Sequence, residues 1–125
     1  MKLLLPQEIE TFYVIPSLRK HLALAMKKNG VKQKDIADIF GINTAAISQY
    51  ISNKRGGNIV FSEEIIQQIN TSSKKINNKV TYLQEIQKLL QFIRESKFLC
   101  QIHKQFSEIP ESCDPQEMGC HGGCR

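Results

Sequence analysis

The twenty residues numbered 33–52, QKDIADIFGINTAAISQYIS, constrain the fold of this chain more than any other segment. Apolar residues recur there at helical spacing on both sides of a single glycine. Ile36 and Ala37 would face inward from a first helix, and Gly41 can adopt the positive φ that a tight turn requires. The residues that would seat a second helix against the first are Ile42, Ile47 and Tyr50. The segment therefore predicts two packed helices joined by a tight turn, as in a helix-turn-helix motif.

Helical patterns flank this segment on both sides. Pro16 is favoured at a first helical position and Asn29-Gly30 gives a stop, so we expect a helix over residues 16–29. The motif itself predicts helices at 32–40 and 44–51, the second capped by Asn43 or Thr44. Ser62, followed by two glutamates, predicts another helix start. Residues 1–15 contain the run FYVI, which fits a short strand, a helical turn or a packing arm and is left unassigned.

A long amphipathic helix is expected in the second half of the chain. The polar run TSSKKINN, residues 71–78, is the best candidate for a connector. Beyond it, apolar residues fall three or four apart, which predicts a helix of about 20 residues. The stripe comprises Ile76, Val80, Leu83, Ile86, Leu90 and Ile93, widened by Leu89 and Phe92. It either packs on the preceding bundle or pairs with a second copy, and we expect the second arrangement, a homodimer.

The positive charge of the chain is concentrated in its first half. The formal net charge is +5, and residues 1–61 hold nine Lys or Arg against four Asp or Glu, whereas residues 62–125 hold eight of each. Basic residues that neutralise phosphates release counterions, so this asymmetry favours a polyanion such as DNA as the partner of the N-terminal half. A merely solvated surface would have the same composition.

If the motif binds DNA, the exposed face of its second helix would reach base edges in the major groove. The expected base-reading residues are Asn43, Thr44, Ala45, Ser48 and Gln49. Gln49 suits adenine and Ala45 suits a thymine methyl group, whereas Thr44 and Ser48 suit base edges or phosphate. The set contains no arginine for guanine, which weakly favours an A·T-rich operator.

Phosphate contacts are expected at both ends of the motif. Gln33 opens the first helix, where its amide and nearby backbone N–H groups can hold a phosphate, and Lys32 and Lys34 flank it. Past the second helix, a basic, glycine-rich loop contributes Asn53, Lys54 and Arg55. Such contacts set affinity and register rather than sequence preference.

One run resembles the lambda-repressor-like (Xre/Cro-type) helix-turn-helix: VKQKDIADIFGINTAAISQYISNKRG. Gln33, Ala37, Gly41, Ile47 and the trailing SQYISNKRG occupy the places expected in that family. The resemblance covers residues 16–70, and the opening LPQEIETFYVIPSLRKHLA is similar to a group of predicted archaeal regulators. It implies a transcriptional regulator that binds a double-stranded DNA operator. Because that group joins the motif to variable C-terminal parts, the resemblance implies nothing about the tail.

The tail at residues 100–125 carries every cysteine of the chain: Cys100, Cys113, Cys120 and Cys124. Four thiolates can complete an iron–sulfur cluster or a tetrahedral zinc site, and the spacings of twelve, six and three intervening residues distinguish neither. His103 provides a possible mixed Cys/His zinc site, and a metal-free thiol switch is a further alternative. We expect an iron–sulfur cluster, [4Fe–4S] in particular, whose binding is coupled to folding of the tail.

These patterns define an all-α chain in three parts: a DNA-binding bundle at 1–70, a dimerisation helix at 71–99 and a metal-binding tail at 100–125. The expected function is a DNA-binding regulator that senses redox or iron–sulfur status. The alternative is a zinc-containing interaction module of the antitoxin type. Nothing in the N-terminal half suggests an enzyme, and His21 is expected to be a packing or surface residue. No apolar run reaches membrane-spanning length or forms a signal-peptide core, so we expect a cytoplasmic protein.

Overall fold

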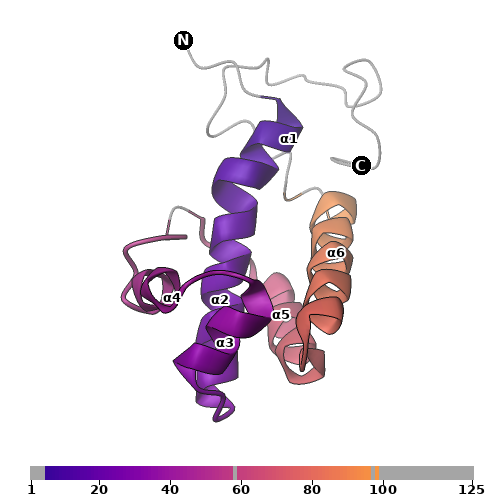
Figure 1. The fold of residues 1–125 in the computed structure, drawn as a ribbon. Coiled ribbons are helices and arrows are strands. Elements are labelled where there is room, and N and C mark those ends of the chain that lie inside the picture. Colours follow the sequence, from indigo (N-terminus) through magenta and orange to yellow (C-terminus); the bar gives the residue numbers. More distant parts are fainter. Residues whose placement is uncertain (1–4, 58, 97, 99–125) are drawn as a thin grey trace, which may run out of the picture.

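The structure, a computed structural model, describes residues 5–57, 59–96 and 98. Within these ranges the chain is helical and contains no strand, which confirms the predicted all-α class for this part (Figure 1). The elements are α1 (Pro6–Ile9), the π-helix η1 (Glu10–Val14), α2 (Ile15–Lys28), α3 (Gln33–Phe40), α4 (Thr44–Ile51), α5 (Glu63–Lys75) and α6 (Lys79–Glu95). No helix among them has the length and apolar character needed to cross a membrane.

The segment that the sequence left unassigned extends α2 toward the N-terminus. In Figure 1, α1, η1 and α2 follow one another as a single rod. Pro6 stands in the first turn of α1, and Ile9 and Val14 are completely buried. The π-helix ends two residues before Pro16, which has no N–H to donate. The Ile15 N–H donates to the Glu10 carbonyl five residues earlier. Helical backbone therefore begins ten residues before the expected start.

The two central helices have almost the predicted bounds. Gly41 ends α3 with φ 70° and ψ 28°, and the Ile42 N–H donates to the Ala37 carbonyl at 3.1 Å. Asn43 caps α4, because its side-chain oxygen accepts from the Ala46 N–H at 2.8 Å. The side chains predicted to face inward are buried or half-buried: Ile36, Ala37, Ile42, Ile47 and Tyr50.

The polar run at 71–78 is only partly a connector, which corrects the sequence-based expectation. Helix α5 continues to Lys75, and Ser72 and Ser73 are buried. Their small side chains allow close packing, and the Ser73 hydroxyl bonds to the Asn70 carbonyl at 2.7 Å. The actual link is residues 76–78, after which Asn78 and Thr81 form a reciprocal cap on α6.

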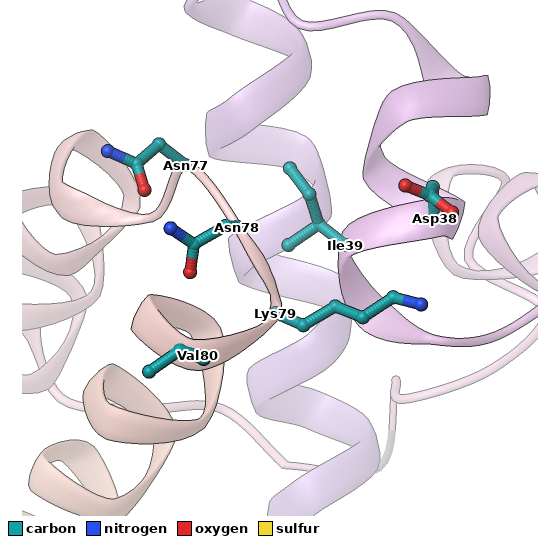
Figure 2. Close-up of a pocket in the computed structure, with 6 residues that line it drawn as sticks. All are labelled: Asp38, Ile39, Asn77, Asn78, Lys79 and Val80. Carbon is teal, nitrogen blue, oxygen red and sulfur yellow. The ribbon is translucent and has the colours of Figure 1, made fainter.

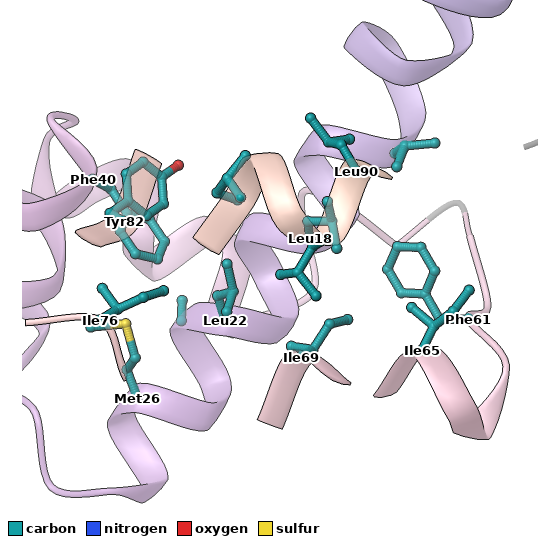
Figure 3. Packing of buried hydrophobic residues seen from close by; sticks show 14 of the residues in the cluster. Leu18, Leu22, Met26, Phe40, Phe61, Ile65, Ile69, Ile76, Tyr82 and Leu90 are labelled. Atoms are coloured by element: carbon teal, nitrogen blue, oxygen red, sulfur yellow. The ribbon is translucent and has the colours of Figure 1, made fainter. Parts of the chain in front are cut away.

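Helix α6 uses most of its apolar stripe within its own chain. One core cluster joins α6 to α2, α3 and α5 (Figure 3). The stripe residues that contribute to it are Ile76, Ile86, Leu89, Leu90 and Ile93, with Phe92 packed against it. In contrast, Val80 and Leu83 remain 62% and 59% exposed. The stripe thus packs on the bundle, and only these two members are left for contact with a second copy.

The N-terminal rod and the end of α6 are joined by an ion pair. The Arg94 Nε donates to Glu10 Oε1 at 2.6 Å, and a second guanidinium nitrogen donates to Glu10 Oε2 at 2.9 Å. Because the two parallel hydrogen bonds fix both planes, the pair is more specific than a single contact. The hydrogen bonds to Glu10 raise the pKa of Arg94 and outweigh the opposing effect of burial.

Candidate nucleic-acid interface

The exposed face of α4 carries the residues expected to read bases. Helix α4 packs on α2 and α3 and lies at the edge of the bundle (Figure 1). Thr44, Ala45 and Ser48 are exposed on it, because Ile47 and Tyr50 occupy the buried face. Asn43 is also exposed, but its side-chain oxygen already accepts from the Ala46 N–H. The amide N–H₂ of Asn43 and the second lone pair of its oxygen therefore remain available for a base or phosphate.

Gln49 lies at the end of α4 and is half-buried. Its Oε1 atom is buried and has no hydrogen-bond partner among the residues that the structure describes. A two-bond contact with adenine needs Oε1 as acceptor as well as the amide N–H₂ as donor. In this conformation the predicted contact would require rotation of the Gln49 side chain.

The start of α3 places backbone N–H groups beside Gln33 and Lys34. Lys32 is the N-cap residue and makes no side-chain cap, so it leaves the N–H groups of the first turn without a partner from the cap side chain. Lys34 is exposed and Gln33 is half-buried. The acidic Asp35 lies in the same turn and reduces the positive potential there. A phosphate at this end would be held mainly by directional hydrogen bonds.

The loop after α4 is packed onto the beginning of α2. Asn53 has a φ of 66°, and its side-chain oxygen accepts a hydrogen bond from the Lys20 ammonium. Gly56 has a φ of 72°, and a Cβ atom there would collide with the Pro16 carbonyl. These contacts hold the backbone on both sides of Lys54 and Arg55, which are exposed. The loop thus presents its two cations next to the end of α4.

Sequence reasoning missed Lys20 as a member of this surface. It is half-buried beside the loop and lies 33 residues from Asn53 along the chain. No local pattern links two such distant positions. The positive φ of Asn53 is compatible with the tendency of asparagine to adopt the left-handed region, but that tendency does not identify its partner.

Tyr82 joins α6 to both α2 and α3. The Arg19 Nε donates to the Tyr82 hydroxyl at 3.2 Å. The Tyr82 ring also stacks on Phe40 at the end of α3, with ring centroids 4.4 Å apart and planes at 21°. Burial lowers the pKa of Arg19, but hydrogen bonds with Tyr82 and Tyr50 raise it, and the net effect is upward. Arg19 therefore links α6 to the buried face of α4.

His21 is half-buried on α2 and packs against an aromatic ring, which is one of the two roles expected for it. Its ring lies against Phe61, with centroids 5.4 Å apart and planes tilted by 60°. Burial lowers the pKa of His21, and the neighbouring charge of Lys20 lowers it further. The imidazole is thus favoured in its neutral form.

The four candidate metal ligands, Cys100, Cys113, Cys120 and Cys124, lie outside the described residues. The iron–sulfur and zinc interpretations of the tail consequently remain predictions. Within the part of the chain that is described, no group of three or more potential metal-binding side chains is found.

Comparisons with protein-family models, with curated proteins and with solved structures give no match to this chain. The resemblance to the Xre/Cro-type motif therefore stays a prediction from the sequence.

Proposed function

We propose that this chain is a sequence-specific DNA-binding transcriptional regulator of the helix-turn-helix class, in which α4 is the recognition helix. The proposal depends above all on one observation: α4 exposes Thr44, Ala45 and Ser48 beside a loop that exposes Lys54 and Arg55. An α-helix fits the major groove, and cations beside it can reach the adjacent phosphates.

The chemistry of these side chains divides the proposed contacts into two kinds. Thr44, Ala45 and Ser48 would contact base edges through hydroxyl and methyl groups, which suit many bases and discriminate modestly. Lys54 and Arg55 would contact phosphates, together with the first turn of α3. Lys20 holds the loop through Asn53, so it would position Lys54 and Arg55. It would also add positive charge near the phosphate backbone of the DNA.

The first experiment separates specific contacts from general basicity. We would select duplexes from a library with a random central segment, using protein purified without air. A double variant, Lys54→Gln with Arg55→Gln, should weaken binding to all sequences and reduce the salt slope by about 2, since each phosphate contact contributes about 0.9. The matched control, Lys74→Gln with Lys75→Gln, removes the same charge from the end of α5.

The two double variants give a clear decision. The control should retain nearly the whole salt slope if the α4 loop contacts DNA. Equal losses in the two variants would instead indicate nonspecific attraction by the net charge. Failure to enrich any sequence in the selection would reject a sequence-specific regulator altogether.

We also propose that the regulator acts in the cytoplasm as a homodimer on a two-fold symmetric operator. Two copies would place their recognition helices about 34 Å apart, one turn of B-DNA. The enriched sequence should then consist of two inverted half-sites with a fixed separation. A single unrepeated site would contradict the homodimer while leaving DNA binding intact.

For the tail, we propose that Cys100, Cys113, Cys120 and Cys124 hold an iron–sulfur cluster whose state alters DNA affinity. Support comes from the donor set, because four cysteine thiolates are the usual ligands of a [4Fe–4S] cluster. When bound, such a cluster would supply one-electron redox chemistry. Protein purified without air should contain iron and sulfide and absorb visible light. A colourless protein containing zinc, with DNA affinity unchanged by oxidation, would reject the sensor.

A further inference from the structure

Two large apolar side chains lie exposed on one face of α6. Val80 and Leu83 are 62% and 59% exposed and lie three residues apart, so they are neighbours on the helix surface. The rest of the apolar stripe is covered by the bundle. These two side chains continue the stripe onto a face that the described part of the chain leaves uncovered.

Val80 also borders a groove between α6 and α3. The groove has a volume of about 370 Å³, and Figure 2 shows Ile39 of α3 across it from the segment that starts α6. Its lining residues are Asp38, Ile39, Asn77, Asn78, Lys79 and Val80. An apolar side chain from outside would therefore find Ile39 and Val80 in the groove and Leu83 beside it.

The charges of the groove are complementary to each other. Asp38 comes from α3 and Lys79 from the first turn of α6, so the groove is lined by one charge of each sign. Neither side chain has an ion-pair partner among the described residues. A two-fold axis that passes between the positions of Asp38 and Lys79 would bring each Asp38 toward the Lys79 of the other copy. A polyanion or an acidic peptide would instead meet the Asp38 carboxylate.

From this arrangement we infer that the groove of α3 and α6, with Val80 and Leu83, is the surface through which two copies of the chain associate. The inference rests on the proposed homodimer and assigns its interface. The proposed interface does not include the exposed residues of α4, because none of them lines the groove. Both recognition helices would remain free for DNA.

The apolar part of this surface consists of Ile39, Val80 and Leu83, which is small for a stable dimer. A specific interface usually buries about 800 Å² per partner. We therefore expect the free protein to associate at micromolar concentrations, and adjacent half-sites to strengthen association by holding two copies together.

A charge exchange tests the two-fold arrangement directly. Asp38→Lys places a cation in the last turn of α3, and Lys79→Asp places an anion in the first turn of α6. Both changes suit the helix dipole, so both variants should fold. Alone, each variant would set like charges against each other across the interface, and its dimer dissociation constant should rise at least tenfold. Mixed in equal amounts, the two variants should form a heterodimer with near wild-type affinity.

Association would be measured by analytical ultracentrifugation of the full chain, purified without air, over a range of concentrations. Leu83→Ser should weaken the dimer at least tenfold without a change of charge. Lys75→Asp alters an exposed charge of α5 outside the groove and should have no effect. Circular dichroism of each variant verifies that it is folded.

The outcomes separate this surface from the proposals on which it rests. A wild-type dimer unaffected by all three groove variants would overturn the surface and leave the homodimer standing. A wild-type protein that stays monomeric both free and on a duplex with two half-sites would overturn both. DNA binding is judged independently, by titrating a single half-site with the Leu83→Ser variant. Restoration of the dimer only in the mixture would establish the two-fold contact.

Discussion

Replacement of Gly41 by alanine tests the turn that sets α4 against α3. Gly41 has φ 70° and ψ 28°, in the left-handed region that residues with a Cβ atom rarely adopt. A Cβ atom at this position would meet no atom within 4 Å. Any destabilisation must therefore come from backbone strain rather than from a steric collision.

The expected size of this effect follows from the conformation. The left-handed region costs an L-residue about 1–2 kcal/mol. Alanine also reduces the entropy of the unfolded chain, which raises the free energy of unfolding by about 0.5 kcal/mol. The net loss should be about 1 kcal/mol, or a fall in Tm of roughly 4–8 °C for a domain of this size. If the turn relaxes by moving α4, DNA affinity should fall by up to about fivefold, the equivalent of 1 kcal/mol.

Thermal unfolding followed by circular dichroism measures the stability, and titration of the selected operator measures the affinity. Gly41→Asn is the first control, because asparagine tolerates the left-handed region and should lose less stability. Gly30→Ala is the second, since Gly30 has a φ of 96° and a Cβ atom there would also meet no atom within 4 Å. It should destabilise the fold without an effect on DNA affinity, because it lies in the turn after α2.

An unchanged Tm in Gly41→Ala would refute the strain argument, as would a greater loss in Gly41→Asn than in Gly41→Ala. Equal losses of DNA affinity in Gly41→Ala and Gly30→Ala would show that affinity follows overall stability and not the position of α4.

Three further changes test the supports of the bundle. Tyr82→Phe removes the hydroxyl that accepts from Arg19 but keeps the ring. It should lower the free energy of unfolding, measured in urea, by about 1–2 kcal/mol. An unchanged free energy would show that this hydrogen bond does not stabilise the fold. His21 has a pKa below its usual 6.5 in the folded state, so the unfolded chain binds more protons; stability should be greatest above pH 6.5 and decline as the pH falls below it. His21→Phe should flatten this decline between pH 5 and 6.5, and an unchanged slope would assign it to other groups. Arg94→Lys replaces the paired hydrogen bonds to Glu10 by one point contact and should lower the free energy of unfolding by about 1 kcal/mol in the same urea assay. An unchanged urea midpoint would show that the two-bond geometry of the pair does not contribute to stability.

The local parts of the candidate site were predictable from the sequence. The bounds of α3 and α4 depend on apolar spacing, on Gly41 and on the Asn43 cap, all of which act over a few residues. Prediction was poorer where polar residues are helical. Ser72 and Ser73 resemble a connector in sequence, and only their burial against the bundle explains why α5 includes them.

Contacts between distant segments were not predictable. The Arg19 link to Tyr82 spans 63 residues, and the Lys20 link to Asn53 spans 33. Each needs two separate segments of the chain to be placed first, after which the side chains find partners that no spacing rule specifies. The same holds for Gln49, whose position on α4 suggests base contact but whose Oε1 is buried.

The sequence by itself determined the helical class of the described residues, the turn at Gly41 and the side of α4 that faces inward, because helical periodicity and caps are local properties. Only the tertiary structure decided what the stripe of α6 covers. Periodicity indicates that one face of a helix is apolar. Which surface covers that face depends on how the helices come together when the chain folds. The bundle covers Leu89 and Ile93 but leaves Val80 and Leu83 exposed, and that division defines the surface proposed for a second copy.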